Sequence, residues 1–131
     1  MDKTTITCYT DGSKMEGDVG AAVYITKDGE TVQEASYYLG SNSTVFQAET
    51  YAINQAASLL LQDGIKNQNI VIHCDSQAAI MAIDNAKIKS KPTRNAVNSL
   101  SALGSDNRVL LRAKSHFGKF HVKLTIKLSP I

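Results

Sequence analysis

The sequence has little that would cross-link it or anchor it in a membrane. Its 131 residues include only two cysteines, Cys8 and Cys74, without the CxxC or Cys/His spacing of a zinc site. Both lie in apolar runs, which favours buried free thiols in a reducing compartment over a disulfide. No apolar stretch approaches the roughly 20 residues that a membrane helix needs, and no secretory signal is recognisable. We expect an intracellular domain, cytoplasmic or nuclear, that is not secreted and has no membrane partner.

Acidic residues are almost absent from the last third of the chain. Residues 86–131 hold ten Lys/Arg and one acid, Asp106, a balance of +9. Residues 1–85 hold four Lys/Arg and eleven Asp/Glu, a balance of −7. This separation suits an enzyme whose metal-binding carboxylates work beside a polyanion, but a basic segment that is simply solvated explains it as well.

Periodicity along the chain predicts alternating strands and helices. Runs rich in β-branched or apolar residues predict five strands, over Thr4–Thr10, Val19–Thr26, Thr31–Leu39, Asn69–Cys74 and Arg108–Arg112. Helical spacing predicts a long helix from Ser43 or Thr44 to Gln62 with Gly64 as its stop, and further helices over Asp75–Ala86 and Thr93–Leu103. Asp28-Gly29 predicts a hairpin turn between the second and third strands.

These elements predict the fold class. The long helix between the third and fourth strands allows the fourth strand to return parallel to the first. The chain is therefore expected to be an α/β protein with a five-stranded mixed sheet flanked by helices. The apolar Asn69–Cys74 strand is typical of a strand that is buried on both faces.

Glu49 is the most informative residue, because it lies on the apolar face of the long helix. It is three or four positions from Val45, Phe46, Ala52 and Ile53, so it shares their side of the helix. An unpaired carboxylate there would be strongly disfavoured, and Thr44–Asp63 contains no Lys or Arg. The partner of Glu49 must therefore come from elsewhere.

Two further carboxylates, Asp11 and Asp75, each follow a predicted strand. If those strands are parallel neighbours, both side chains emerge at the same edge of the sheet, where the first turns of the long helix carry Glu49. Three carboxylates repel one another unless a hard divalent cation lies between them, and oxygen-rich sites suit Mg²⁺. Two such ions, roughly 3.5–4 Å apart, can align an attacking water and a leaving oxygen in phosphodiester hydrolysis.

Each aspartate also has a structural explanation that the residues alone leave open. Asp11-Gly12 is a common turn dipeptide, and Asp75 can cap the helix that follows it. Glu49 has neither explanation. An Asp after a strand, a Glu on the apolar face of a helix and an Asp after a second strand, in that order, indicate a metal site more specifically than any one of these acids alone.

Three blocks of the sequence resemble type 1 ribonuclease H domains. They are YTDGSK at Tyr9–Lys14, STVFQAETYAI at Ser43–Ile53 and IVIHCDSQAAI at Ile70–Ile80. The resemblance covers roughly Thr4 to Arg112 and is strongest to the domain found in non-LTR retrotransposon reverse transcriptase polyproteins. The family's first three catalytic carboxylates fall on Asp11, Glu49 and Asp75.

The resemblance implies a ribonuclease H-like fold and a function. Asp11, Glu49 and Asp75 would be catalytic and metal-binding, with two Mg²⁺ ions for which Mn²⁺ can substitute. The activity would be endonucleolytic hydrolysis of the RNA strand of an RNA–DNA hybrid, with RNA recognised through its 2′-hydroxyls. Gly12, Ser13, Ser76 and His116 fall where the family contacts substrate. The chain would be part of, or derived from, a reverse transcriptase polyprotein.

The chain departs from the family after Arg112, which stands where the family usually has Trp. The family next presents a Gly-Asn-Glu block and a helix that carries a fourth catalytic Asp, whereas residues 119–131 contain no acid. Their apolar residues alternate with polar ones, which indicates a strand. We therefore expect a ribonuclease H-like domain over residues 1–118 and an atypical basic tail over residues 119–131.

Two features of this region have alternative explanations. His116 would assist proton transfer or product release in the family, and a surface histidine without a role is as compatible with the sequence. The tail lysines either bind phosphates or protect an edge strand from pairing with another chain.

Two functional hypotheses follow. The first is the Mg²⁺-dependent hybrid ribonuclease. The second is a catalytically impaired copy that only binds nucleic acid, because the fourth carboxylate is missing. A receiver-type signalling domain is set aside, since it needs two adjacent acids after its first strand and Asp11 has no acidic neighbour before Glu16.

Overall fold

Three antiparallel strands begin the fold: β1 (Thr5–Met15), β2 (Asp18–Lys27) and β3 (Glu30–Gly40). The computed structural model describes residues 5–85, 90–114 and 122–128. β1 is longer than predicted, because it continues through Asp11-Gly12 and turns only at Glu16-Gly17, where both φ angles are positive (51° and 86°). The predicted hairpin at Asp28-Gly29 is confirmed, again with two positive φ angles (52° and 85°), as a twisted two-residue turn requires.

The long helix α1 (Val45–Gln62) follows, with the boundaries that its sequence predicts. The Thr44 side chain accepts a hydrogen bond from the Gln47 backbone N–H, and the Gln47 side chain accepts one from the Thr44 backbone N–H. Gly64 lies just beyond the helix with φ of 69°, a conformation that favours glycine and stops the helix.

The second half of the chain alternates between strands and helices. Its elements are β4 (Asn69–Cys74), α2 (Gln77–Asp84), α3 (Lys91–Gly104), β5 (Arg108–Lys114) and β6 (Val122–Leu128). Proline is tolerated at the start of a helix, because its missing N–H would have no helical partner there. Pro92 accordingly lies in the first turn of α3 rather than before it.

The strands form one mixed sheet in the order β3-β2-β1-β4-β5-β6. β4 lies parallel to both β1 and β5, and β6 pairs antiparallel with β5. The predicted five-stranded mixed sheet flanked by helices is therefore confirmed. The strand periodicity of the tail adds β6 as a sixth strand at the edge.

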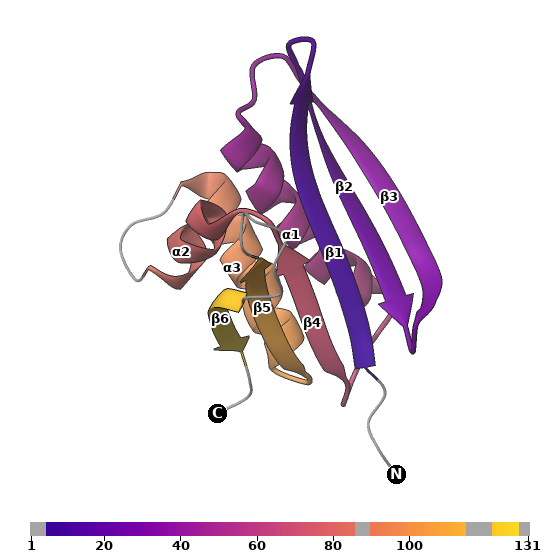
Figure 1. Cartoon of the computed structure of the whole chain (residues 1–131). Helices are drawn as coiled ribbons and strands as arrows, with labels where there is room; N and C mark the ends of the chain where they lie inside the picture. Colours follow the sequence, from indigo (N-terminus) through magenta and orange to yellow (C-terminus); the bar gives the residue numbers. More distant parts are fainter. Residues whose placement is uncertain (1–4, 86–89, 115–121, 129–131) are drawn as a thin grey trace.

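The helices gather on one side of this sheet (Figure 1). α1 packs against β1, β2 and α3, and the buried side chains of β1, β2, β4 and β5 point toward the helices. The prediction that β4 is buried on both faces is wrong. Ile70, Ile72 and Cys74 are buried, whereas the alternating Val71 and His73 are only partly covered by the described residues. We call the side under the helices the covered face and the other side the open face.

Within the described residues, none of the helices combines the length and the apolar character needed to cross a membrane.

Candidate active site

The parallel pairing of β1 with β4 brings Asp11 and Asp75 to the same edge of the fold. Thr10 and Cys74 are register partners, and each is followed directly by one of the two aspartates. The Thr10 hydroxyl donates a hydrogen bond to the backbone oxygen of His73 (3.0 Å), which ties the two strands together at this point. Because β1 continues past Asp11, the explanation of Asp11-Gly12 as a turn is wrong.

Gly12 allows the start of α1 to approach β1 very closely. A Cβ atom at this position would lie 2.7 Å from the backbone nitrogen of Glu49 and 2.9 Å from two atoms of Ala48. Such distances are too short for any residue other than glycine without displacing the helix backbone. Gly12 therefore determines how closely Glu49 approaches β1.

Glu49 points inward from α1 with Ala52 and Ile53, as predicted, whereas Val45 and Phe46, which were predicted to share that face, are exposed. Glu49 is only 5% exposed. The Gly12 backbone N–H and the Cys74 thiol both donate hydrogen bonds to its carboxylate, the thiol at 3.4 Å from Glu49 Oε2. These contacts come from β1 and β4, so the partner of Glu49 is supplied by tertiary structure.

The three carboxyl groups affect one another electrostatically. Burial raises the pKa of Glu49, the Gly12 and Cys74 hydrogen bonds partly offset that increase, and the charges of Asp11 and Asp75 add to it. Burial also raises the pKa of Asp11, and the charge of Asp75 contributes in the same direction. Asp11, Glu49 and Asp75 therefore lie near enough to repel one another, as the sequence predicted.

Cys74 completes the surroundings of Glu49. Burial and the neighbouring Glu49 charge raise the pKa of its thiol to about 12, so it stays protonated and acts as a donor. Both cysteines are free and buried, as their apolar runs predict. The contact between Cys74 and Glu49 was missed by sequence reasoning. The sequence offered one signal for this contact. Cys74 immediately precedes Asp75, at the end of a strand whose alternate residues point inward.

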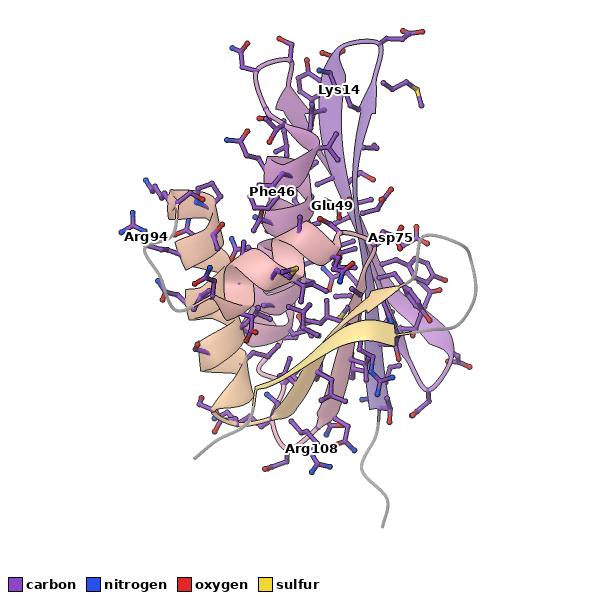
Figure 2. The ribbon with its side chains drawn as sticks, turned by 60° about the vertical axis from the view of Figure 1, so that its left-hand side comes forward. Lys14, Phe46, Glu49, Asp75, Arg94 and Arg108 are labelled. Atoms are coloured by element: carbon purple, nitrogen blue, oxygen red, sulfur yellow. The ribbon has the colours of Figure 1, made fainter. Side chains whose placement is uncertain are left out.

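The chemistry of the donor groups fits a hard cation. In the part of the chain that the structure describes, no three His, Cys, Asp or Glu side chains are already placed to hold a metal ion. The converging groups are nevertheless carboxylate oxygens, whose mutual repulsion a divalent cation would relieve. Figure 2 shows Glu49 and Asp75 together near the centre of the molecule, with the labelled basic side chains at its outer parts. Among the described residues, the groups that shift the pKa of Glu49 include no lysine or arginine.

The remaining predicted site residues have different positions. Ser76 caps α2 by accepting a hydrogen bond from the Ala79 backbone N–H (3.1 Å). The explanation of Asp75 as this cap is therefore wrong. Ser13 is exposed on β1 directly after Gly12. His116 lies outside the described residues.

A pocket that sequence reasoning missed adjoins the carboxylates on the open face. Its volume is about 250 Å³, and Asp11 and Asp75 line it together with Tyr9, Tyr24 and His73. The signal for it was weak, because aromatic residues in strands are ordinarily core residues or scattered surface residues.

Several solved structures are similar to this one. An RNase H1 from the halophilic archaeon Halobacterium salinarum NRC-1 is 22% identical with a TM-score of 0.63, covering 83% of this chain and 86% of its own. LC11-RNase H1, isolated from compost, is 27% identical with a TM-score of 0.59, covering 79% and 76%. A second structure of it, in complex with an RNA/DNA hybrid, gives a TM-score of 0.63 at 21% identity, covering 82% and 85%.

A viral structure shares the fold within a much longer chain. The protease-reverse transcriptase of prototype foamy virus is 18% identical with a TM-score of 0.60 and covers 94% of this chain, but only 19% of the viral chain is matched. Among curated proteins, no significant match is found.

The family comparison covers nearly the whole sequence. The family model described as RNase H matches residues 3–124. That range includes the three carboxylates and all the described strands of the sheet except the last residues of β6. The chain therefore belongs to the RNase H family.

Proposed function

We propose that this chain is a Mg²⁺-dependent endonuclease that hydrolyses the RNA strand of RNA–DNA hybrids by a two-metal-ion reaction. The observation that carries the proposal is the buried Glu49, held by β1 and β4 and coupled electrostatically to Asp11 and Asp75. Membership of the RNase H family supports ribonuclease chemistry. The RNA/DNA hybrid bound by LC11-RNase H1 supports the choice of substrate.

Asp11, Glu49 and Asp75 would hold the metal, which supplies a Lewis acid that lowers the pKa of water and neutralises charge on the phosphate. The chain's own contribution is to fix these oxygens in place. Gly12 permits the close approach of α1, and its N–H together with the Cys74 thiol orients the Glu49 carboxylate. A carboxylate held in this way loses little conformational freedom when a cation binds.

Substrate contacts are proposed around the same edge. The exposed Ser13 hydroxyl and the backbone at Gly12 lie beside the carboxylates, and Ser76 lies directly after Asp75. Together with His116 they are proposed to contact the RNA strand, where 2′-hydroxyls distinguish RNA from DNA. The intracellular location and the division into residues 1–118 and 119–131 stay predictions.

One observation favours the second candidate, a domain that binds hybrids but is catalytically impaired. The family's fourth carboxylate comes from a helix, and in this chain Val122–Leu128 forms β6 along β5 instead. A weaker metal site would raise the reaction barrier by reducing charge neutralisation. The two candidates share the carboxylate site and differ only in turnover.

The deciding experiment is cleavage of a labelled RNA–DNA hybrid with Mg²⁺ or Mn²⁺. We expect cleavage by the parent and a loss of at least about 100-fold in Asp11→Asn, the effect of removing one preorganised electrostatic contact. Asp63→Asn is the matched control, because Asp63 is exposed at the opposite end of α1 from Glu49. Equal activity in the parent and Asp11→Asn would contradict the assigned site.

A thermal measurement tests metal binding independently of cleavage. Mg²⁺ at ten times its Kd stabilises a folded protein by about 1.4 kcal/mol, which raises Tm by several degrees in a domain of this size. We expect this rise in the parent and not in Asp11→Asn. A rise in Tm and hybrid binding without cleavage would establish the impaired domain. Absence of a rise at millimolar Mg²⁺ would argue against metal binding altogether.

We also propose that the chain is part of, or derived from, a reverse transcriptase polyprotein. The likeness to a segment of the foamy virus protein supports this origin. Sequencing of the genomic region around the coding segment tests it, and the absence of any reverse transcriptase-like reading frame nearby would contradict it.

A further inference from the structure

Aromatic and cationic side chains form a row across the open face of four strands. Tyr9 is the register partner of Tyr24 on β2 and of His73 on β4, and His73 is the partner of Arg112 on β5. Residues that are directly paired across strands project to the same side of a sheet. These four residues therefore form a continuous line, which we call the open-face row.

The rings of the open-face row are arranged for stacking. Tyr9 and His73 are stacked, with centroids 5.3 Å apart and an interplanar angle of 19°. Tyr9 and Tyr24 are 6.1 Å apart and tilted by 52°, so their rings diverge. The two tyrosines are 40% and 38% exposed. Neighbouring exposed aromatic rings on one face indicate a binding surface more often than isolated ones do.

A pocket lies where the row meets the carboxylates. Its volume of about 250 Å³ is below the roughly 300–1,000 Å³ of pockets for drug-sized ligands, and suits a single planar ring system. Tyr9, Tyr24 and His73 line it together with Asp11 and Asp75. Ala22, the register partner of Asp11, also lines it, and its small side chain keeps the space open.

The two ends of the open-face row carry opposite charges. Arg112 lies half-buried at the β5 end, and its buried Nε has no hydrogen-bond partner among the described residues. Glu34, the register partner of Tyr24, is exposed at the opposite end. A polyanion whose planar groups contact the rings would therefore place its backbone charge toward Arg112. Guanidinium groups also stack on planar ligands.

We propose that the open-face row and its pocket bind single-stranded nucleic acid, with an unpaired base seated over Ala22 between the tyrosine rings and the carboxylates. Every base has a π-face, and aromatic rings on a sheet are an established platform for stacking unpaired bases. The proposal goes beyond the proposed function, because it requires neither metal nor cleavage. A strand bound there would run directly past Asp11 and Asp75.

Fluorescence anisotropy of a labelled ten-nucleotide single-stranded DNA tests the proposal, in EDTA and again with Mg²⁺. Stacking contributes about 1–3 kcal/mol per base, so we expect Tyr24→Ala to weaken binding by about tenfold. Tyr24→Phe keeps the ring and should bind like the parent. Tyr38→Ala removes a tyrosine that is 75% exposed on β3, outside the row, and should also bind like the parent.

Filling the pocket gives an independent test. Ala22 is exposed, so a larger side chain there should leave Tm near that of the parent. We expect Ala22→Leu to weaken binding of the single strand by about tenfold, the loss of one stacked base, and Ala22→Ser to leave it unchanged. An abasic strand of equal length should bind more weakly than the normal strand and should not distinguish Ala22→Leu from the parent.

Any of the following results would overturn the proposal. If the parent does not bind the strand, or if Tyr24→Ala and Tyr38→Ala weaken binding equally, the row is not a base-stacking surface. If light scattering shows a dimer that Ala22→Leu dissociates, the face is an interface with a second copy. Single-stranded DNA is not the substrate of the proposed ribonuclease, so a failure to cleave hybrids would leave this test intact.

Discussion

The two faces of the sheet are built from alternate residues of the same strands, yet they carry different chemistry. On β1 and β4 the covered face presents Ile6, Cys8, Ile70 and Ile72, which are at most 2% exposed. The open face presents Tyr9, Asp11 and His73 and the residue Asp75 that follows β4. The period of two in a strand separates these groups without any change in backbone.

The covered face carries most of the buried core, and the open face borders the candidate site. The covered face is packed by the helices, and one residue of the helices, Glu49, reaches the strand ends as a charged group rather than an apolar one. The candidate active site therefore lies where the two faces meet, at Gly12 and Asp75. Substitutions on the covered face should act through stability, and substitutions on the open face through binding.

The largest expected effect on stability comes from a substitution on the covered face of β4, compared with a substitution on its open face. Ile72→Ala removes a fully buried side chain and should lower the free energy of unfolding by about 2–5 kcal/mol. Val71→Ala, one residue away on the open face, should cost less than about 1 kcal/mol, because Val71 is only half-buried. Urea denaturation measures both, and similar losses would show that the open face is also packed.

The next effect concerns the junction of the faces at Gly12. Gly12→Ala places a methyl group against the backbone of α1 and should lower the free energy of unfolding by about 1–3 kcal/mol. It should also displace Glu49 and reduce hybrid cleavage. Gly20→Ala is the control, since its added Cβ would meet only the Tyr37 backbone oxygen at 3.3 Å. A stable, fully active Gly12→Ala variant would disprove the close approach.

The smallest effect on stability concerns the charge of Glu49. Its pKa is raised in the folded protein, so its ionised form opposes folding above that pKa, and the cost disappears as the pH falls through the raised value. Glu49→Gln should therefore have a Tm equal to or above that of the parent at pH 7 without metal, and the two should converge at acidic pH. Cleavage should fall by at least about 100-fold.

Thermal unfolding from pH 3 to 8 in EDTA measures the stability difference between Glu49→Gln and the parent. A Tm well below that of the parent at every pH would mean that Glu49 is a structural residue. Glu34→Gln is the control, because Glu34 is exposed on β3 and its removal should leave the pH dependence unchanged.

Much of the fold could be predicted because local signals agreed with one another. The capping box at Thr44 and Gln47, the stop at Gly64 and the Asp28-Gly29 turn each act within a few residues. The end of β1 was mispredicted because Asp-Gly favours a turn locally. Pairing of Asp11-Gly12 with Ala21 and Ala22 on β2 extends the strand instead.

The candidate site was predictable in its carboxylates and not in its surroundings. Asp11, Glu49 and Asp75 are each unusual for their local context, so they could be recognised individually. The Cys74 thiol, the Gly12 contact and the open-face row depend on which strands are neighbours and in which register. No local pattern determines that register, because it is set by long-range packing.

By itself, the sequence determined the order of the strands and helices, the inward position of Glu49 and the absence of an acid from the tail, since periodicity and composition are local properties of a chain. Only the tertiary structure decided that β4 lies between β1 and β5, that Glu49 meets Gly12 and Cys74, and that Tyr24, Tyr9, His73 and Arg112 align. The physical reason is that these contacts join residues far apart in sequence. Burial of apolar side chains on the covered face sets the register of the strands. That register in turn sets which open-face residues lie side by side.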